Sequence, residues 1–342
     1  MSDTSSRAFV VGCEGAHLNA DEIKFFGNMR PWGLILFRRN IVEPSQVKAL
    51  ISEFRDAVGR PDAPVLVDQE GGRVQRLGPP HWRRYPSGAR FMEVSKGDVN
   101  AAAELARLSA RLIAHDLFDV GISIDCAPVL DLPVDGMTDA IGDRAYARDP
   151  MTIAKIGRAF ADGLIAGGIL PVIKHMPGHG RAMVDSHKDL PLVQTPKDIL
   201  SKTDFVPFRR LADLPIAMTA HIVFHDIDPD NPATASRHLI QTIIRSEIGF
   251  GGLLLSDDMS MEALKGDFGS RARAIFEAGC DMAVHCNGRI EEARAVAAAT
   301  PYLAGVSLER ANRVISMLNK APEAFDPVDA AAKLDAALAL PS

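Results

Sequence analysis

The sequence predicts an α/β protein that folds as a single (β/α)8 barrel. Short apolar runs, rich in β-branched residues, recur eight times, and sequence with helical periodicity lies between them. The runs are continuous rather than alternating, which is typical of strands in a parallel sheet buried on both faces. A length of 342 residues suits one large barrel or two smaller domains. A doubly wound open sheet is the alternative fold, but no G-x-G-x-x-G follows a strand.

The predicted strands and helices alternate along the chain. In order, the strands are AFVVG near residue 8, GLILF at 33, PVLVD at 64, SIDCAPVL at 123, LPVIKH at 170, PIAMTAHIVF at 215, GLLLSDD at 252 and MAVHC at 282. The helical stretches between them include SQVKALISEFRDAV, AAAELARLSARLIAHDLF, TIAKIGRAFADGLIA and HLIQTIIRSEI. Several open with Pro, Ser or Asp and close at Gly, as helix caps predict.

The sequence after the last strand is helical and Ala-rich. No further strand is predicted there, so a second strand-bearing domain does not fit. We therefore expect one domain over residues 1–342, with the barrel at about 8–300 and extra C-terminal helices at about 301–340.

Composition excludes some partners. The chain is 47% hydrophobic and 24% charged, and its formal net charge of −6 gives no reason to expect a nucleic acid. The sequence shows neither a signal peptide nor an apolar run of about 18 residues, so we expect a cytoplasmic protein without membrane contact. The four cysteines share no metal spacing and are expected to be buried free thiols: Cys13, Cys126, Cys280 and Cys286.

Polar residues gather where the predicted strands end. Active sites of (β/α)8 barrels lie at the carboxyl ends of the strands. The residues at these exits are Asp68, Glu70, Arg73, Arg76, Asp143, Arg144, Lys174, His175, His221, Asp257 and Asp258. Helix capping would explain some of them, such as Asp258, but not all. The pattern therefore predicts an active site at this end of the barrel.

Two adjacent acids follow the seventh strand, in LLLSDDMSM. An N-cap for the next helix needs one carboxylate and not both. Asp257 is the first of the pair and lies closest to the barrel mouth. A carboxylate fixed there suits a nucleophile that attacks an electrophilic carbon.

The loop KHMPGHGRAMVDSHKDLP, residues 174–191, carries three histidines between glycines and a proline. Asp185 and His187 lie two residues apart and can reach one side of an extended segment. A carboxylate beside an imidazole fixes its tautomer and raises its pKa, which suits acid–base catalysis. Spacing alone would favour a surface hydrogen bond instead.

Three cations accompany these acids. Arg76, Arg144 and Lys174 could form structural ion pairs. Converging with Asp68, they would instead suit a polar, partly anionic ligand.

Five ordered motifs carry a resemblance to a known family. DQEGGRVQR, GDRAY, KHMPGHG, DSH and SDDMSM are similar to motifs of family 3 of the glycoside hydrolases, over roughly residues 8–300. Within it, the chain resembles the bacterial β-N-acetylglucosaminidases, or β-hexosaminidases, of peptidoglycan recycling. The resemblance implies a TIM barrel, in agreement with the pattern of strands and helices.

The resemblance also implies roles for single residues. Asp257 would be the nucleophile, His187 the general acid/base, and Asp185 the group that orients His187. The sugar would be bound by Asp68, Arg76, Arg144, Lys174 and His175. Met176 departs from the family pattern, where Phe is usual, and exchanges one apolar side chain for another. Larger members carry a second α/β domain that the sequence does not show, so the acid/base is expected from the chain's own loop.

The expected reaction is a retaining double displacement through a glycosyl-aspartate. The expected substrates are GlcNAc-containing muropeptides such as GlcNAc-1,6-anhydroMurNAc, with or without peptide, from which terminal GlcNAc is removed. No cofactor or metal is expected, and the chain is expected to be a monomer. Water and phosphate both remain open as the acceptor.

Two alternatives belong to other classes. A metal-dependent barrel hydrolase could use His175, His179 and His187 as ligands. The first strand lacks a His-x-His, however, and the histidines lack i, i+4 spacing. A non-catalytic sugar-binding barrel would not need both a nucleophile and an acid/base.

Overall fold

Eight parallel strands close into a barrel in the computed structural model, which describes residues 6–137, 139–182, 190–318 and 320–339. The order around the barrel is β1-β12-β11-β9-β7-β6-β3-β2. The strands are β1 (Arg7–Gly12), β2 (Pro31–Leu36), β3 (Val65–Val67), β6 (Ile124–Asp125), β7 (Leu170–Met176), β9 (Ile216–Thr219), β11 (Leu253–Asp258) and β12 (Met282–His285). Each begins within one of the predicted runs or within two residues of it, and the predicted (β/α)8 fold is confirmed.

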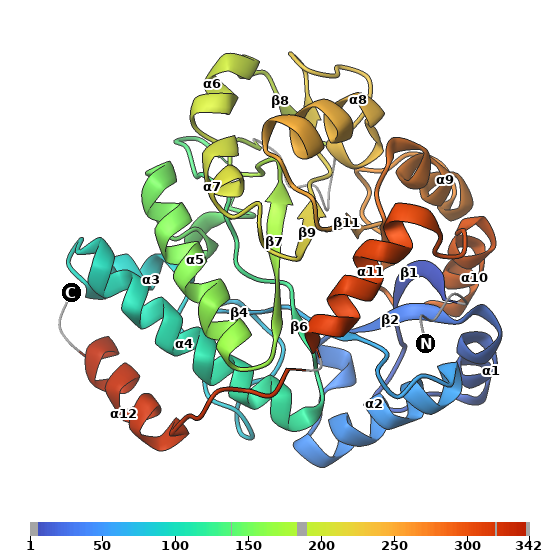
Figure 1. Ribbon diagram of the computed structural model, residues 1–342, viewed down its shortest axis with the longest axis horizontal. Helices are drawn as coiled ribbons and strands as arrows, with labels where there is room; N and C mark the ends of the chain where they lie inside the picture. Colours follow the sequence, from blue (N-terminus) through green and yellow to red (C-terminus); the bar gives the residue numbers. More distant parts are fainter. Residues whose placement is uncertain (1–5, 138, 183–189, 319, 340–342) are drawn as a thin grey trace.

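Helices surround the barrel in Figure 1. They are α1 (Ala20–Met29), α2 (Pro44–Val58), α3 (Gly88–Val94), α4 (Val99–Val120), α5 (Pro150–Ala166), α6 (Lys197–Lys202), α7 (Phe205–Arg210), α8 (Arg237–Leu239), α9 (Phe268–Ala278), α10 (Ile290–Ala299), α11 (Gly305–Leu318) and α12 (Pro327–Leu338). Shorter helical turns are η1 (Arg38–Asn40), η2 (Gly142–Arg144), η3 (Ala233–Ala235) and the π-helical η4 (Ile240–Glu247).

Helix ends follow the capping rules that the sequence suggested. The side chain of Asp149 accepts the N–H of Thr152 at the start of α5, and Pro150 occupies the first turn, where its missing N–H costs nothing. Gly121 ends α4 with φ +88°, a left-handed conformation that glycine adopts without strain.

Two small sheets add to the barrel at its carboxyl end. The segment DQEGGRVQR forms a hairpin of β4 (Gln69–Gly71) and β5 (Val74–Gln75). The sixth predicted run divides into β9 and β10 (Val223–Phe224), and β10 pairs with β8 (Leu192–Val193) rather than with the barrel. The sequence did not predict this division.

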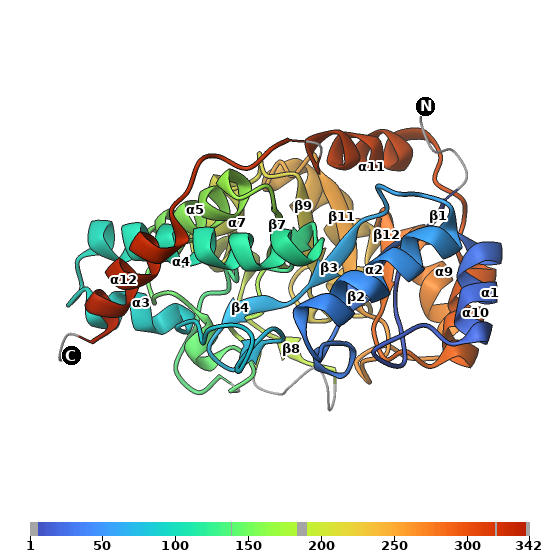
Figure 2. The same cartoon turned by 90° about the horizontal axis from the view of Figure 1, so that it is seen from below.

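The apolar core has two parts. One lies between the strands and the surrounding helices, and the other fills the barrel interior. Leu303, Ala311 and Val314, from α11 and the segment before it, belong to the interior part. Figure 2 shows α11 at the end of the molecule opposite β8. This end is therefore packed shut, and the strand exits lie at the other one.

The C-terminal helices α11 and α12 are present outside the barrel, as predicted, and α12 packs against α4. No helix in the described part of the chain combines the length and apolarity needed to span a bilayer.

Candidate active site

A cavity of about 380 Å³ opens at the carboxyl ends of the strands. This volume is in the range of small-molecule sites. Six of the eight residues predicted for the site line it: Asp68, Arg76, Arg144, Lys174, His175 and Asp257. The other two, Asp185 and His187, lie outside the described residues. Part of the wall is apolar and includes Met218, Met261 and Val284.

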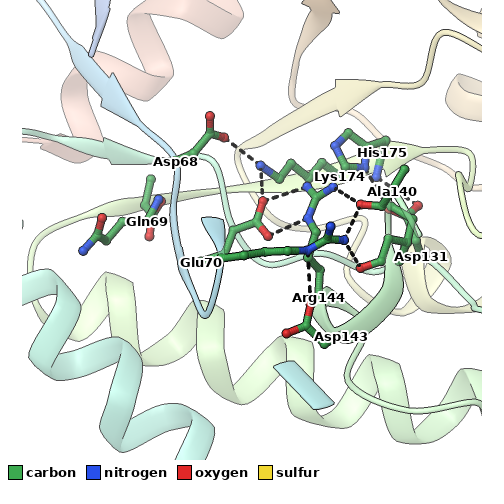
Figure 3. Close-up of polar contacts among 12 residues, drawn as sticks. Asp68, Gln69, Glu70, Asp131, Ala140, Asp143, Arg144, Lys174 and His175 are labelled. Atoms are coloured by element: carbon green, nitrogen blue, oxygen red, sulfur yellow. Dashed lines mark hydrogen bonds and ion pairs between the residues drawn. The ribbon is translucent and has the colours of Figure 1, made fainter. Parts of the chain in front are cut away.

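Lys174 connects two carboxylates in the wall of this cavity. It is 2% exposed, and its Nζ lies 2.8 Å from Asp68 Oδ1 and 2.7 Å from Glu70 Oε1 (Figure 3). Burial alone would raise the pKa of Asp68, but Lys174 and Arg76 hold it below its ordinary value. Burial alone would lower the pKa of Lys174, which the two carboxylates raise instead. Asp68, Glu70 and Lys174 are therefore all charged.

Arg144 binds Glu70 through two parallel hydrogen bonds. Its Nε lies 2.9 Å from Oε2 and its Nη2 lies 2.8 Å from Oε1 (Figure 3), the fork geometry in which guanidinium binds carboxylate most strongly. Nη1 donates to the carbonyl of Ala140 at 3.0 Å. Glu70 thus joins Lys174 to Arg144, a role that the sequence did not reveal. Its position two residues after Asp68, at the same strand exit, was the available signal.

Arg76 completes this charged wall from the β4–β5 hairpin. Its Nη2 donates to Asp68 Oδ2 at 2.9 Å, and its guanidinium carbon lies 5.1 Å from the centre of the Phe37 ring. The predicted convergence of Arg76, Arg144, Lys174 and Asp68 is therefore present, and Phe37 contributes an aromatic face to the cavity.

His175 is held from behind by a buried carboxylate. Asp131 is completely buried, and its Oδ2 lies 2.7 Å from His175 Nδ1 (Figure 3). Its Oδ1 accepts the backbone N–H groups of His175, at 3.2 Å, and of His179, at 2.6 Å. Burial alone would raise the pKa of Asp131, but His175 lowers it, so Asp131 is ionised. The sequence did not single out Asp131, because its place in the site depends on how the strands meet.

Asp257, at the end of β11, faces the cavity beside the histidines. Burial alone would raise its pKa, but His175 and the hydrogen bond from the N–H of Asp258 lower it, so the side chain is a carboxylate. Its Oδ1 accepts the N–H of Asp258 at 2.8 Å. Burial, and after it the neighbouring His175, lower the pKa of His179 to about 4, so that ring is neutral near neutral pH.

Asp258 binds backbone rather than capping a helix. Its carboxylate accepts the N–H of Ser260 at 3.0 Å and that of Cys286 at 3.1 Å. The next helix, α9, has Asp267 as its N-cap. The idea that Asp258 caps a helix was wrong, because a nine-residue connection separates it from α9.

In the described ranges, no group of three or more His, Cys, Asp or Glu residues is placed to hold a metal ion. His187, one of the three ligands that a metal-dependent hydrolase would use, lies outside those ranges. The cavity can present the Asp257 carboxylate, together with a wall of charged hydrogen-bonding groups, to a polar ligand such as a sugar.

A (β/α)8 barrel with a carboxylate facing a polar, sugar-sized cavity is the architecture of a barrel glycoside hydrolase. The model of the glycosyl hydrolase family 3 N-terminal domain matches residues 16–317. The chain belongs to this family and is a glycoside hydrolase, which confirms the resemblance seen in its motifs.

Similar proteins agree with this membership. A β-hexosaminidase of Methylococcus capsulatus is 42% identical over 277 residues, 80% of either chain. One from Pseudomonas aeruginosa is 40% identical over 288 residues, 83% of either chain. The structure of native NagZ from Neisseria gonorrhoeae is similar with a TM-score of 0.83 and 31% identity, over 98% of this chain and 96% of that one. A family 3 β-N-acetylglucosaminidase from Paenibacillus has a TM-score of 0.84 and 25% identity, over 98% of this chain and 68% of that one.

Proposed function

We propose that this protein is a retaining exo-β-N-acetylglucosaminidase that removes terminal, non-reducing GlcNAc from peptidoglycan-derived muropeptides in the cytoplasm. The observation that carries the proposal is the cavity itself, in which the Asp257 carboxylate faces a wall formed by Asp68, Lys174 and other charged groups. The names of the β-hexosaminidase and β-N-acetylglucosaminidase relatives support the N-acetylhexosamine substrate.

The charged wall suits sugar hydroxyls. Each hydroxyl both donates and accepts, so carboxylates and cations alternating along one wall can satisfy several at once. Asp68, Lys174, Arg76, Arg144 and His175 are the proposed sugar-binding residues. The cavity volume of about 380 Å³ suits a single sugar unit, which supports cleavage at a chain end rather than within a chain.

The proposed chemistry has two steps. Asp257 attacks the anomeric carbon while His187, protonated and oriented by Asp185, gives its proton to the departing oxygen. His187, now neutral, then removes a proton from water as the water attacks the glycosyl-aspartate. Two inversions give overall retention. A histidine in the acid/base role places no second negative charge beside Asp257 or beside an anionic substrate.

The test is turnover with product analysis. The protein should hydrolyse a chromogenic β-N-acetylglucosaminide, and nuclear magnetic resonance should show the β-anomer of GlcNAc first. Muropeptide fragments should lose GlcNAc, and the same reaction with phosphate present distinguishes water from phosphate as acceptor. Binding without turnover would instead identify a sugar-binding barrel. Activity that disappears on chelation and returns with a divalent metal would identify a metal-dependent hydrolase.

A further inference from the structure

His221 lies directly behind the acid pair that ends β11. It follows β9 and is completely buried, behind the cavity wall rather than in it. Its ring joins two segments. Nε2 lies 3.0 Å from the carbonyl oxygen of Asp258, and Nδ1 lies 2.7 Å from the hydroxyl of Thr234. The sequence placed His221 at a strand exit, and neither the sugar contacts nor the acid/base loop uses it.

The partners of the ring fix its tautomer. A carbonyl oxygen only accepts hydrogen bonds, so the proton of His221 is on Nε2. Burial lowers the pKa of His221, so the ring is neutral and its Nδ1 carries no proton. The hydroxyl of Thr234 lies 2.7 Å from Nδ1 and 3.0 Å from the carbonyl oxygen of Ala220, and it donates its proton to Nδ1, the nearer of the two acceptors. The hydroxyl of Thr219 lies 2.8 Å from that of Thr234 and can donate to it in turn. His221 is thus a fixed donor aimed at Asp258.

Asp258 has each of its polar groups bound. His221 binds its carbonyl, and its carboxylate accepts from Cys286 and from the N–H and hydroxyl of Ser260, the latter at 2.5 Å. Its own N–H donates to Asp257 Oδ1 at 2.8 Å. Oδ2 of Asp257 takes no hydrogen bond from the residues that the structure describes. The two oxygens of Asp257 are therefore inequivalent.

We propose that His221 is a positioning residue for the nucleophile: it fixes the backbone of Asp258, whose N–H holds Asp257 Oδ1, so that Oδ2 is the oxygen that attacks the sugar. The proposal rests on the proposed role of Asp257. In the attack, Oδ2 forms the bond to the anomeric carbon, the bond to the leaving oxygen breaks, and that oxygen takes the proton of the general acid. Oδ1 becomes the ester carbonyl oxygen and keeps its hydrogen bond to Asp258.

Two substitutions separate positioning from simple packing. In His221→Gln the amide nitrogen can take the place of Nε2 and still donate to the Asp258 carbonyl. In His221→Asn the shorter amide reaches only the place of Nδ1. His225→Asn, at an exposed histidine four residues on, is the matched control. Each variant is assayed on a chromogenic β-N-acetylglucosaminide, trapped with a 2-fluoro or 5-fluoro glycosyl donor, and checked for folding by circular dichroism.

The expected result is a loss of kcat in the variants that cannot donate a hydrogen bond to the Asp258 carbonyl. Because a misplacement of about 1 Å can cost about a hundredfold in rate, His221→Asn should lower kcat and the trapping rate about 10- to 100-fold, with KM nearly unchanged. His221→Gln should remain within about threefold of wild type, as His225→Asn should, because its donor is kept. If His221→Asn does not fold, Thr234→Val replaces it. That variant removes the donor to Nδ1, and kcat should fall with KM unchanged.

Other outcomes would overturn the proposal. Wild-type kcat in folded His221→Asn, or in Thr234→Val where that variant stands in for it, would show that the donor is unnecessary. Equal losses in the Gln and Asn variants would assign His221 to packing. If the proposed function itself were wrong, the wild-type protein would carry no fluorosugar on Asp257. This result differs from every outcome that tests His221 alone.

Discussion

Asp131 and His175 form a buried carboxylate–imidazole pair, with 2.7 Å between Asp131 Oδ2 and His175 Nδ1. The carboxylate also accepts two backbone N–H groups, so it cannot turn away from the ring. A carboxylate in this position keeps a proton on Nδ1 and leaves Nε2 for a ligand. The pair joins the loop after β6 to the end of β7, which are far apart in sequence and adjacent in the barrel.

Asp131→Asn should damage catalysis more than stability. The asparagine oxygen can still accept the backbone N–H groups, but its NH2 group faces Nδ1 and moves the proton of His175 to Nε2. We expect kcat/KM to fall about a hundredfold, as for other small misplacements in active sites. Steady-state kinetics with thermal unfolding measure both effects, and Asp143→Asn, at the partly exposed rim, is the control. Unchanged kinetics would remove this pair from the site.

Lys174→Met should destabilise the protein in a pH-dependent way. Without the ammonium, Asp68 and Glu70 lose the buried cation they share, which costs about 3–5 kcal/mol. In the wild type the pKa values of both acids are lowered, so their stabilising effect is present above the ordinary values of 3.8 and 4.5 and is lost as pH falls. In Lys174→Met the ammonium no longer opposes the effect of burial, so the pKa values of Asp68 and Glu70 rise and their protonated forms are favoured. Urea unfolding should therefore show a difference that is largest at neutral pH and shrinks in acid, whereas a difference independent of pH would contradict this account.

Asp125→Asn should stabilise the protein at alkaline pH. Asp125 is completely buried, its Oδ1 accepts the N–H of Gln69 at 2.9 Å, and none of the described residues forms a hydrogen bond with its Oδ2. Burial raises its pKa from 3.8 to about 8. The folded protein then binds one more proton than the unfolded chain between these values, so the contribution of Asp125 to stability is full below 3.8 and lost as pH rises toward 8.

The asparagine keeps the acceptor for Gln69 and does not ionise. The stability of the variant relative to wild type should therefore increase from pH 5 to pH 9, as measured by denaturant unfolding at several pH values. Parallel pH curves for the two proteins would show that Asp125 does not titrate in this range.

The two acids that end β11 should differ sharply in function. Asp257→Ala should lower kcat by orders of magnitude while the protein remains folded. A 2-fluoro or 5-fluoro glycosyl donor should leave a covalent sugar on Asp257 in peptide mass spectra. Oδ1 of Asp258 accepts the backbone N–H groups of Ser260 and Cys286, and Oδ2 accepts the hydroxyl of Ser260, so Asp258→Asn should mainly reduce stability. A sugar found on Asp258 would reverse the assignment.

The barrel followed from the sequence because buried parallel strands leave a strong local signal. Continuous apolar runs marked all eight barrel strands, and polar residues after them marked the site. Glu70 and Asp131 are different, because their importance comes from what the closed barrel brings beside them. The division of PIAMTAHIVF at His221 was hidden for the same reason, since the run is apolar on both sides of the break.

His187→Ala should discriminate between leaving groups. A general acid matters most when the departing oxygen is a poor leaving group, and little for an acidic phenol. Natural disaccharides should therefore be cleaved far more slowly, and a dinitrophenyl glycoside much less so. Asp185→Asn should show the same pattern more weakly, with its basic pH limb moved down, because a lost carboxylate lowers the pKa of His187. Equal losses on both substrates would give His187 a structural or binding role instead.

The helix α11 determines the order in which products can leave. Leu303, Ala311 and Val314 pack into the barrel interior at the end opposite the cavity, so the described residues leave a bound sugar the opening at the strand exits as its way out. In the proposed reaction the remainder of the substrate lies across that opening and must depart before the sugar can. Release is then ordered, with the free sugar last. Since the free sugar and a new substrate need the same space, accumulated sugar should compete directly with substrate and slow the enzyme as its product builds up.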